Sequence, residues 1–173
     1  RWWLVAIFSA LMLVKVFLVL VIVLLACILV HELGHVLGDL LVGFRFNYIR
    51  VGPLRVDRGG RVSWLWTWRG LTSGATSSYP VSRSGLRWKR FTSVAAGPAA
   101  NFGAAYFASK ILPENNSILA GACFFFVGLS SLFGLINMLP FGTAEPVSDG
   151  LQLWILLFSK KRRDRLLLIL GFV

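Results

Sequence analysis

Acidic residues, histidine and cysteine are all scarce in this chain of 173 residues. It has 7 Asp and Glu against 18 Lys and Arg, with only two histidines and two cysteines. Cys27 and Cys123 lie in apolar runs without C-x-x-C spacing, which excludes a disulfide framework as the basis of the fold. Charged residues make up 14% of the sequence, whereas a soluble domain has about 25%. The chain therefore lacks the charge needed to cover a soluble protein.

Apolar residues dominate instead, at 57% of the sequence with a mean hydropathy of +0.74. Residues 16–38, 91–112 and 118–139 are each long enough to cross a hydrocarbon core of about 30 Å. The segment 91–112 is rich in small residues, which suit close helix contact. Residues 2–14 are also apolar and either extend the first span or end a preceding one. These stretches predict an α-helical membrane protein with three core transmembrane helices.

The segment 44–68 has a different pattern, with short alternating runs of β-branched and aromatic residues. Gly-Pro and Gly-Gly pairs within it predict turns, so we expect a β-hairpin or small sheet near the cytoplasmic membrane face. Its tryptophans, Trp64, Trp66 and Trp68, alternate along the chain; they either form an interfacial belt or pack on the helices. Residues 70–90 are polar, basic and rich in Gly and Ser, which predicts a loop.

Short additional helices are expected at the chain ends, one of them beginning at Asp149. We expect residues 1–173 to form one intramembrane core, and no internal repeat is visible.

Basic residues concentrate in two segments that flank the apolar spans. Ten of the 18 Lys and Arg lie between residues 45 and 90, and five more lie between 160 and 165. The positive-inside rule places both segments in the cytoplasm, which predicts a multi-pass integral protein of the cell membrane. Nucleic-acid binding is the competing interpretation of such charge. Because the membrane spans already explain the charge, we expect a lipid bilayer and no nucleic acid as partner.

Two histidines and a glutamate interrupt the first apolar span. Residues four apart share one face of an α-helix, so His31 and His35 can hold a single metal ion. Glu32 lies beside them and is placed to act as a general base on water, as in the H-E-x-x-H arrangement of zinc hydrolases. An ionisable residue at the centre of a transmembrane helix costs about 2.5–3.5 kcal/mol. This cost favours a functional role over hydrogen bonding to neighbouring helices without a metal.

A catalytic zinc needs a third protein ligand and an open position. The sequence offers no third histidine, and three acids lie in the basic hairpin, the outer turn or the basic tail: Asp57, Glu114 and Asp164. Asp149 follows the third span and opens another helix, so it can approach from a different direction. We expect Asp149 to be the third ligand, with Glu145 as the second choice.

Two further residues on the first span lie one turn from the histidines. Asp39 is four residues beyond His35 and is expected to orient that imidazole rather than to bind metal. Cys27 is four residues before His31 and would lie deeper in the membrane. We expect it to be a small packing residue.

Three motifs cover nearly the whole chain: HELGH at 31–35, AGPAANF at 96–102, and NMLP at 137–140 followed by DG at 149–150. Together, and in this order, they make the chain resemble the site-2 protease family of intramembrane zinc metalloproteases. The resemblance implies that His31, His35 and Asp149 bind one Zn²⁺ and that Glu32 activates water. It also implies that Asn101, as a second catalytic residue, and Asn137 help to position the peptide bond or the oxyanion. Gly97 and Pro98, in the same motif as Asn101, are expected to position the substrate.

The same resemblance implies an active site below the cytoplasmic face and a sheet that pairs with an unwound substrate. We therefore expect a zinc endopeptidase that cleaves peptide bonds in or near transmembrane segments of membrane proteins. The alternative is a membrane-embedded metal-binding scaffold without proteolytic activity, against which the intact base Glu32 argues. A metal-ion transporter would need polar residues along several helices, and these spans have few. The sequence leaves the substrate and the oligomeric state open.

Overall fold

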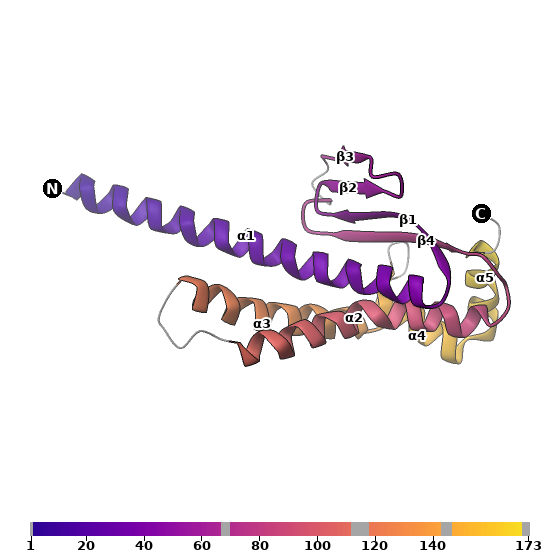
Figure 1. Ribbon diagram of the computed structural model, residues 1–173. Helices are drawn as coiled ribbons and strands as arrows, with labels where there is room; N and C mark the ends of the chain where they lie inside the picture. The colour runs from indigo at the N-terminus through magenta and orange to yellow at the C-terminus, as the bar shows by residue number, and fades with distance from the viewer. Residues whose placement is uncertain (1, 67–69, 112–117, 143–146, 171–173) are drawn as a thin grey trace.

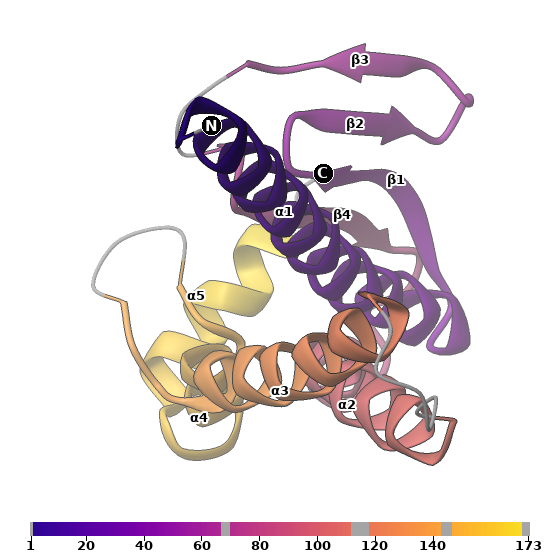
Figure 2. The same ribbon diagram turned by 90° about the vertical axis from the view of Figure 1, so that its left-hand side faces the viewer.

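The computed structural model describes residues 2–66, 70–111, 118–142 and 147–170 (Figure 1). Within these ranges a four-stranded sheet and the hairpin of α2 and α3 lie on different sides of the long helix α1 (Figures 1 and 2). The helices are α1 (Trp2–Leu41), α2 (Leu86–Lys110), α3 (Ile118–Met138), α4 (Asp149–Phe158) and α5 (Lys160–Leu170). The strands are β1 (Phe44–Val51), β2 (Leu54–Asp57), β3 (Val62–Trp64) and β4 (Gly74–Pro80).

Helix α1 is continuous from Trp2 to Leu41, so residues 2–14 extend the first predicted span. Its 40 residues make a helix about 60 Å long at a rise of about 1.5 Å per residue. Residues 2–18 are all exposed, whereas the buried residues of the helix begin at Val23 and include His31 and Glu32. The packed part of α1 is therefore its second half, which carries the predicted metal ligands.

Among the described helices, α1 and α3 are long and apolar enough to cross a membrane. The predicted spans 16–38 and 118–139 are thus matched by α1 and α3. The remaining predicted span, 91–112, corresponds to helix α2, which is not apolar enough to meet this criterion for crossing a membrane. The helix begins earlier than expected, at Leu86, and its uncharged part is rich in small and polar residues, Asn101 among them, which keep its hydropathy low.

The interface between α1 and α2 is made of small residues. A Cβ atom placed on Gly34 would lie 2.6 Å from Cβ of Ala100, and one on Gly38 would lie 2.6 Å from Cβ of Ala96. Glycines four residues apart let two helix backbones approach closely, as in small-xxx-small helix pairs. This close packing holds α2 against the same stretch of α1 that bears His31 and His35.

The sheet is antiparallel, with strand order β3-β2-β1-β4. Strands β1, β2 and β3 confirm the β-rich segment predicted over 44–68 as far as residue 66; Trp68 lies outside the described residues. Trp64 and Trp66 stack with ring centroids 6.2 Å apart. Each is 62% exposed, so these two tryptophans do not pack against the helices.

Strand β4 lies within residues 70–90, where the sequence predicts a loop. The backbone of Gly74–Pro80 pairs with β1, with Thr76 opposite Ile49 and a register shift between Phe46 and Tyr48. Local composition misses this strand because its Ser and Thr residues are typical of loops, whereas pairing with an existing strand supplies the backbone hydrogen bonds. As a result the sheet gains an edge strand next to α1.

The sheet folds back along α1 rather than extending away from its end (Figure 1). At the turn after β1, a Cβ atom on Gly52 would lie 3.0 Å from Cδ2 of Leu25. Leu25 precedes His31 by almost two helical turns. Strands β1 and β4 therefore run past the level of the histidines on their way along α1.

Arg50 shapes the chain that enters β4. Its guanidinium donates to the main-chain oxygens of Gly52, Gly70, Ser73 and Gly74 over 3.2–3.5 Å. Carbonyls in an irregular segment need such donors when regular pairing is absent. Arg50 therefore fixes where β4 begins, opposite the metal-ligand stretch of α1.

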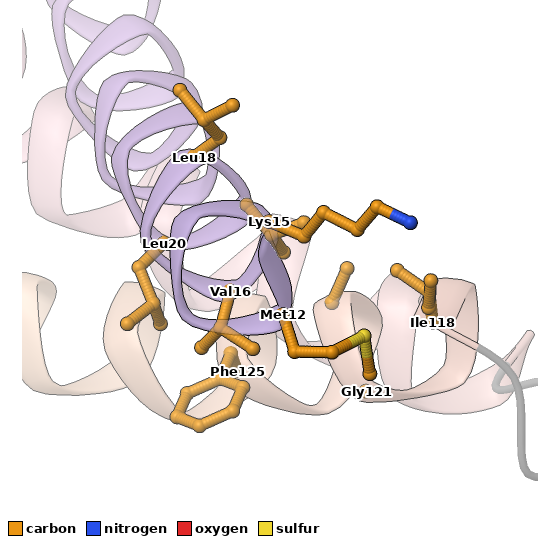
Figure 3. Close-up of a pocket in the computed structure, with 10 residues that line it drawn as sticks. Met12, Lys15, Val16, Leu18, Leu20, Ile118, Gly121 and Phe125 are labelled. Carbon is orange, nitrogen blue, oxygen red and sulfur yellow. The ribbon is translucent and has the colours of Figure 1, made fainter. Parts of the chain in front are cut away.

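A cavity of about 430 Å³ opens between the first half of α1 and the start of α3 (Figure 3). Its lining is apolar apart from Lys15, and includes Val16, Leu20 and Phe125. None of the predicted site residues lines it. The chemistry predicted from the sequence must therefore lie elsewhere, near the other end of α1.

Candidate metal centre and catalytic site

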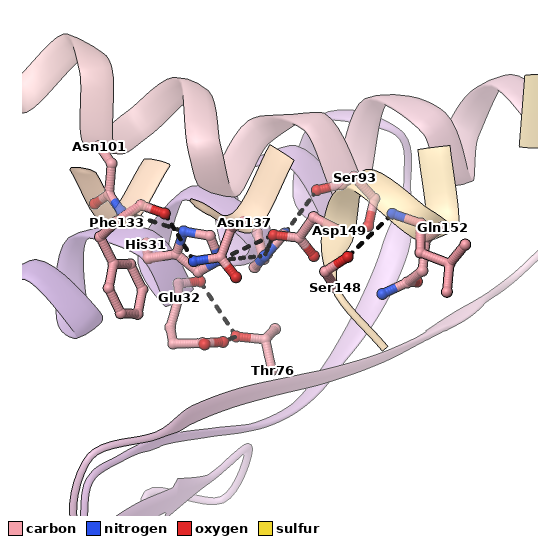
Figure 4. A network of polar contacts seen from close by, with 12 residues as sticks. His31, Glu32, Thr76, Ser93, Asn101, Phe133, Asn137, Ser148, Asp149 and Gln152 are labelled. Atoms are coloured by element: carbon pink, nitrogen blue, oxygen red, sulfur yellow. Dashed lines mark hydrogen bonds and ion pairs between the residues drawn. The ribbon is translucent and has the colours of Figure 1, made fainter. Parts of the chain in front are cut away.

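The three predicted metal ligands, which come from α1 and α4, meet in one place (Figure 4). Oδ2 of Asp149 lies 3.0 Å from Nε2 of His31 and 3.3 Å from Nε2 of His35. The two Nε2 atoms are 3.1 Å apart. Glu145, the second choice for the third ligand, lies outside the described residues. Within the described part of the chain, these three residues form the cluster that could hold a metal ion.

The spacing of the three atoms fits a tetrahedral metal site. Zinc bonds of about 2.0–2.1 Å at tetrahedral angles separate ligand atoms by about 3.3 Å, close to the 3.0–3.3 Å found here. Oδ2 of Asp149 is buried and accepts no hydrogen bond of acceptable geometry among the described residues. A cation bound between the three atoms would satisfy this oxygen.

Asp149 lies outside both apolar spans, at the first turn of α4. Burial raises the pKa of its carboxyl group, but the neighbouring imidazoles of His31 and His35 outweigh that effect and lower the pKa to about 2. The side chain is therefore a carboxylate at neutral pH, which is the form that binds a metal.

The hydrogen bond of Nδ1 in His35 determines which ring nitrogen is free to bind a metal. Nδ1 lies 2.9 Å from the main-chain oxygen of Ser93. A carbonyl oxygen only accepts, so Nδ1 carries the proton and the lone pair is on Nε2, inside the cluster. The expectation that Asp39 orients His35 is wrong: Asp39 is 2% exposed, and its Oδ1 has no hydrogen-bond partner among the described residues. Ser93 on α2 orients the ring instead.

Nδ1 of His31, the ring nitrogen outside the cluster, faces the side-chain amide of Asn101. Nδ1 lies 3.3 Å from Nδ2 of Asn101, while Oδ1 of that fully buried amide has no partner in the part of the chain that the structure describes. A half-turn of the amide exchanges its oxygen and nitrogen. Oδ1 would then accept the proton of Nδ1, and Nε2 of His31 would be free for a metal. Both histidines thus fit a metal bound through Nε2.

Glu32 lies beside the ligands without joining them. Its Oε2 accepts a hydrogen bond of 2.7 Å from Oγ1 of Thr76 on β4, and the side chain is buried. The carboxylate therefore contacts the sheet, while the two histidines contact α2. Figure 4 shows this division, with Thr76 on one side and Ser93 on the other.

A model of Peptidase family M50 matches residues 19–119. The chain belongs to this family. Its members are membrane-embedded, zinc-dependent metalloendopeptidases of the site-2 protease type. The matched region includes the H-E-x-x-H residues and Asn101, and it ends before Asn137 and Asp149. No curated protein and no solved structure matches the chain significantly.

In this M50 peptidase, the residues predicted to position substrate have different surroundings. Gly97 packs against His35, whose ring atoms are the nearest to any Cβ placed on this glycine. Pro98 is buried inside the continuous helix α2, where it removes one backbone donor. Asn137 donates from Nδ2 to the main-chain oxygen of Phe133 at 2.9 Å. Substrate contact by these residues and by Asn101 stays a prediction.

The predicted third ligand of this M50 peptidase, Asp149, is held in place by its two neighbours in the chain. Ser148 is the N-cap of α4; its Oγ accepts from the N–H of Leu151 at 3.2 Å and donates to the main-chain oxygen of Leu139 at 2.6 Å. Gly150 packs directly on the backbone of Met138, where a side chain would collide. The end of α3 and the start of α4 are thereby held together, with Asp149 between them.

Helix α4 is also held at its far end by the basic start of α2. Arg87 donates from Nε to the main-chain oxygen of Leu156 at 2.9 Å, and from Nη2 to that of Leu157 at 3.4 Å. Nη2 of Arg90 donates to Oε1 of Gln152 at 2.8 Å. A guanidinium beside the last carbonyls of a helix also stabilises the negative end of its dipole.

Sequence reasoning missed Ser93, Thr76 and Ser148 in this M50 peptidase. Ser148 could have been found, because a serine directly before an acidic residue and an apolar run is an N-cap signature. Ser93 acts through its main-chain oxygen, which any residue type supplies. Thr76 lies in a run of similar residues, GATSSY, where nothing local distinguishes it.

Proposed function

We propose that this M50 peptidase is an intramembrane zinc endopeptidase that hydrolyses peptide bonds in or near transmembrane segments of other membrane proteins. The observation that carries the proposal is the convergence of His31, His35 and Asp149, whose potential ligand atoms lie 3.0–3.3 Å from one another. Glu32 is next to His31 in the same long apolar helix. A zinc ion held by these three residues would polarise the scissile carbonyl and acidify the attacking water.

The chain's own residues supply the proton transfers. Glu32 takes a proton from water on its carboxylate group, while the remaining hydroxide adds to the carbonyl carbon. Glu32 then gives that proton to the amide nitrogen as the carbon–nitrogen bond breaks. The new amine leaves and takes up the proton of the new carboxylic acid, so the products are an ammonium group and a carboxylate, and Glu32 is again ionised.

We propose that α2 also spans the membrane, which would give the three core transmembrane helices expected from the sequence. Its 25 residues give a length of about 38 Å, enough for the hydrocarbon core, and it packs against both apolar helices α1 and α3. Arg87, Lys89 and Arg90 at its start would lie at the cytoplasmic interface. His31 would then lie about 15 Å from the cytoplasmic end of α1, counted along the helix to Leu41.

The proposed substrate is a transmembrane protein whose helix unwinds near the site. Strand β4 is an edge of the sheet, so one side of its backbone is open to pair with an extended chain. It also contacts Glu32 through Thr76. Support for this substrate class comes from the edge strand together with the membrane-embedded nature of the family.

The decisive experiment compares the wild type with Glu32→Gln in membranes of the source cell. Full-length proteins that accumulate only with Glu32→Gln are the expected substrates, and the purified variant should keep its zinc, since Glu32 is not a ligand. Asp164→Asn, on exposed α5, is the matched control and should behave as the wild type.

Cleavage of a trapped substrate by purified Glu32→Gln at the wild-type rate would overturn the mechanism. Zinc binding by the wild type without turnover of any trapped protein would instead indicate a metal-binding scaffold.

A further inference from the structure

Strand β4 contacts the proposed general base through one hydroxyl group. Oγ1 of Thr76 lies 2.7 Å from Oε2 of Glu32 and 3.2 Å from its main-chain oxygen. The carboxylate is buried, and its Oε2 accepts this bond from a strand that is distant in sequence from α1 (Figure 4). A hydrogen bond to an ionised group is about twice as strong as one between neutral groups.

Gly74 makes the same face of β4 fit the carboxylate. Residues two apart on a strand point to the same face, so Gly74 and Thr76 both face α1. A Cβ atom on Gly74 would lie 2.6 Å from Cδ of Glu32, well inside contact distance. The absence of a side chain at 74 and the hydroxyl at 76 together define the space in which the carboxylate lies.

The sheet, not α1, fixes the position of that hydroxyl. The backbone of Thr76 is paired with Ile49 of β1, and the main-chain oxygen of Gly74 accepts from Arg50 at 3.5 Å. Thr76 is therefore held in place from the strand side. Rotation of the Glu32 side chain away from β4 would break its bond to this fixed donor.

We propose that Thr76 is a positioning residue for catalysis: its hydroxyl holds Oε2 of Glu32 and so fixes the orientation of the carboxylate that acts as the general base. This inference rests on the proposed function, in which Glu32 is the base. Within the described part of the chain, the hydroxyl of Thr76 bonds to Glu32, so we expect it to act through that residue. Loss of the hydroxyl should lower kcat about tenfold to a hundredfold, with KM and zinc content unchanged.

The test uses the full chain in liposomes with a single-span reporter protein whose transmembrane segment contains Asn-Pro. Wild type, Thr76→Val, Thr76→Ser and Glu32→Gln are compared for kcat, KM and bound zinc. Thr76→Val keeps the shape of the side chain without the hydroxyl, and Thr76→Ser keeps the hydroxyl. Ser77→Ala is the control, because Ser77 is next to Thr76 on β4 and so lies on the opposite face, where it accepts an exposed bond from Asn47.

The expected result is a lower kcat for Thr76→Val at wild-type KM and zinc content, with Thr76→Ser and Ser77→Ala within about twofold of the wild type. Wild-type kcat in Thr76→Val, or a loss in Thr76→Ser equal to that in Thr76→Val, would overturn the positioning role. If Thr76→Val does not fold, Thr76→Ala makes the same comparison. Equal cleavage by wild type and Glu32→Gln would overturn the proposed function itself.

Discussion

Oδ2 of Asp149 lies 3.0 Å from Nε2 of His31, although α2 and α3 separate the two residues in the sequence. The contact brings the start of α4 to the buried half of α1. With His35 beside them, the two residues form the cluster on which the proposed zinc chemistry depends.

Removal of the third ligand should abolish stoichiometric zinc binding. We expect Asp149→Ala to weaken zinc affinity by at least about a hundredfold, because two imidazoles alone leave the site incomplete. Zinc measured per chain after purification, and after titration with a chelator, checks this. Asp164→Ala is the control. Full zinc content in Asp149→Ala would show that another residue is the third ligand.

Asn101 should increase metal affinity because its side-chain amide holds Nδ1 of His31. Asn101→Leu removes this partner at similar volume, and partners of this kind contribute about tenfold to a hundredfold to metal affinity. Competition with a chromogenic zinc chelator measures the change. Asn47→Leu alters an exposed asparagine of β1 and should have no effect. An unchanged affinity in Asn101→Leu would argue that His31 needs no such partner.

Gly97→Ala should disturb His35, since the added methyl group meets its imidazole. Overpacking of this kind costs about 1–3 kcal/mol, and we also expect weaker zinc binding because the ring must move. Gly103 lies on the same helix with nothing within 4 Å of a placed Cβ, so Gly103→Ala should be neutral or stabilising. Thermal unfolding in detergent and zinc content compare the two. Equal behaviour of both variants would contradict the packing role of Gly97.

The proposed crossing of the membrane by α2 can be tested by labelling of single cysteines. In a chain without Cys27 and Cys123, we expect Ser82→Cys to react with a membrane-impermeant maleimide from the cytoplasm. Asn116→Cys, in the segment between α2 and α3, should react from the opposite side. Labelling of both positions from the same side would show that α2 does not cross the membrane.

The part of the site on one helix could be predicted from the sequence, because helical periodicity alone places His31, Glu32 and His35 together. Asp149 could be predicted because so few acids are available and a D-G motif follows the third span. The contacts that orient His35 and Glu32 could not be predicted from the sequence. Ser93 contributes a backbone oxygen that has no residue-type signature, and Thr76 depends on the pairing of β4 with β1.

Two errors in the predicted fold and site share one physical cause. Residues 70–90 have the composition of a loop, yet part of the segment becomes β4 because β1 offers an unpaired edge. Asp39 has the spacing of an orienting partner for His35, yet the helix packing brings Ser93 to that nitrogen instead. In both cases a contact between distant segments decides the outcome, and local pattern carries no information about it.

The basic residues at the start of α2 link membrane orientation to metal binding. Arg87 and Arg90 belong to the charge cluster expected to face the cytoplasm, and the same side chains hold α4, the helix that begins with Asp149. Neutralising them would remove a topology signal and loosen the third ligand at once. In the proposed topology, a chain inserted in the reverse orientation would take its arginines to the other face of the membrane. Orientation and assembly of the metal site would then depend on the same two side chains.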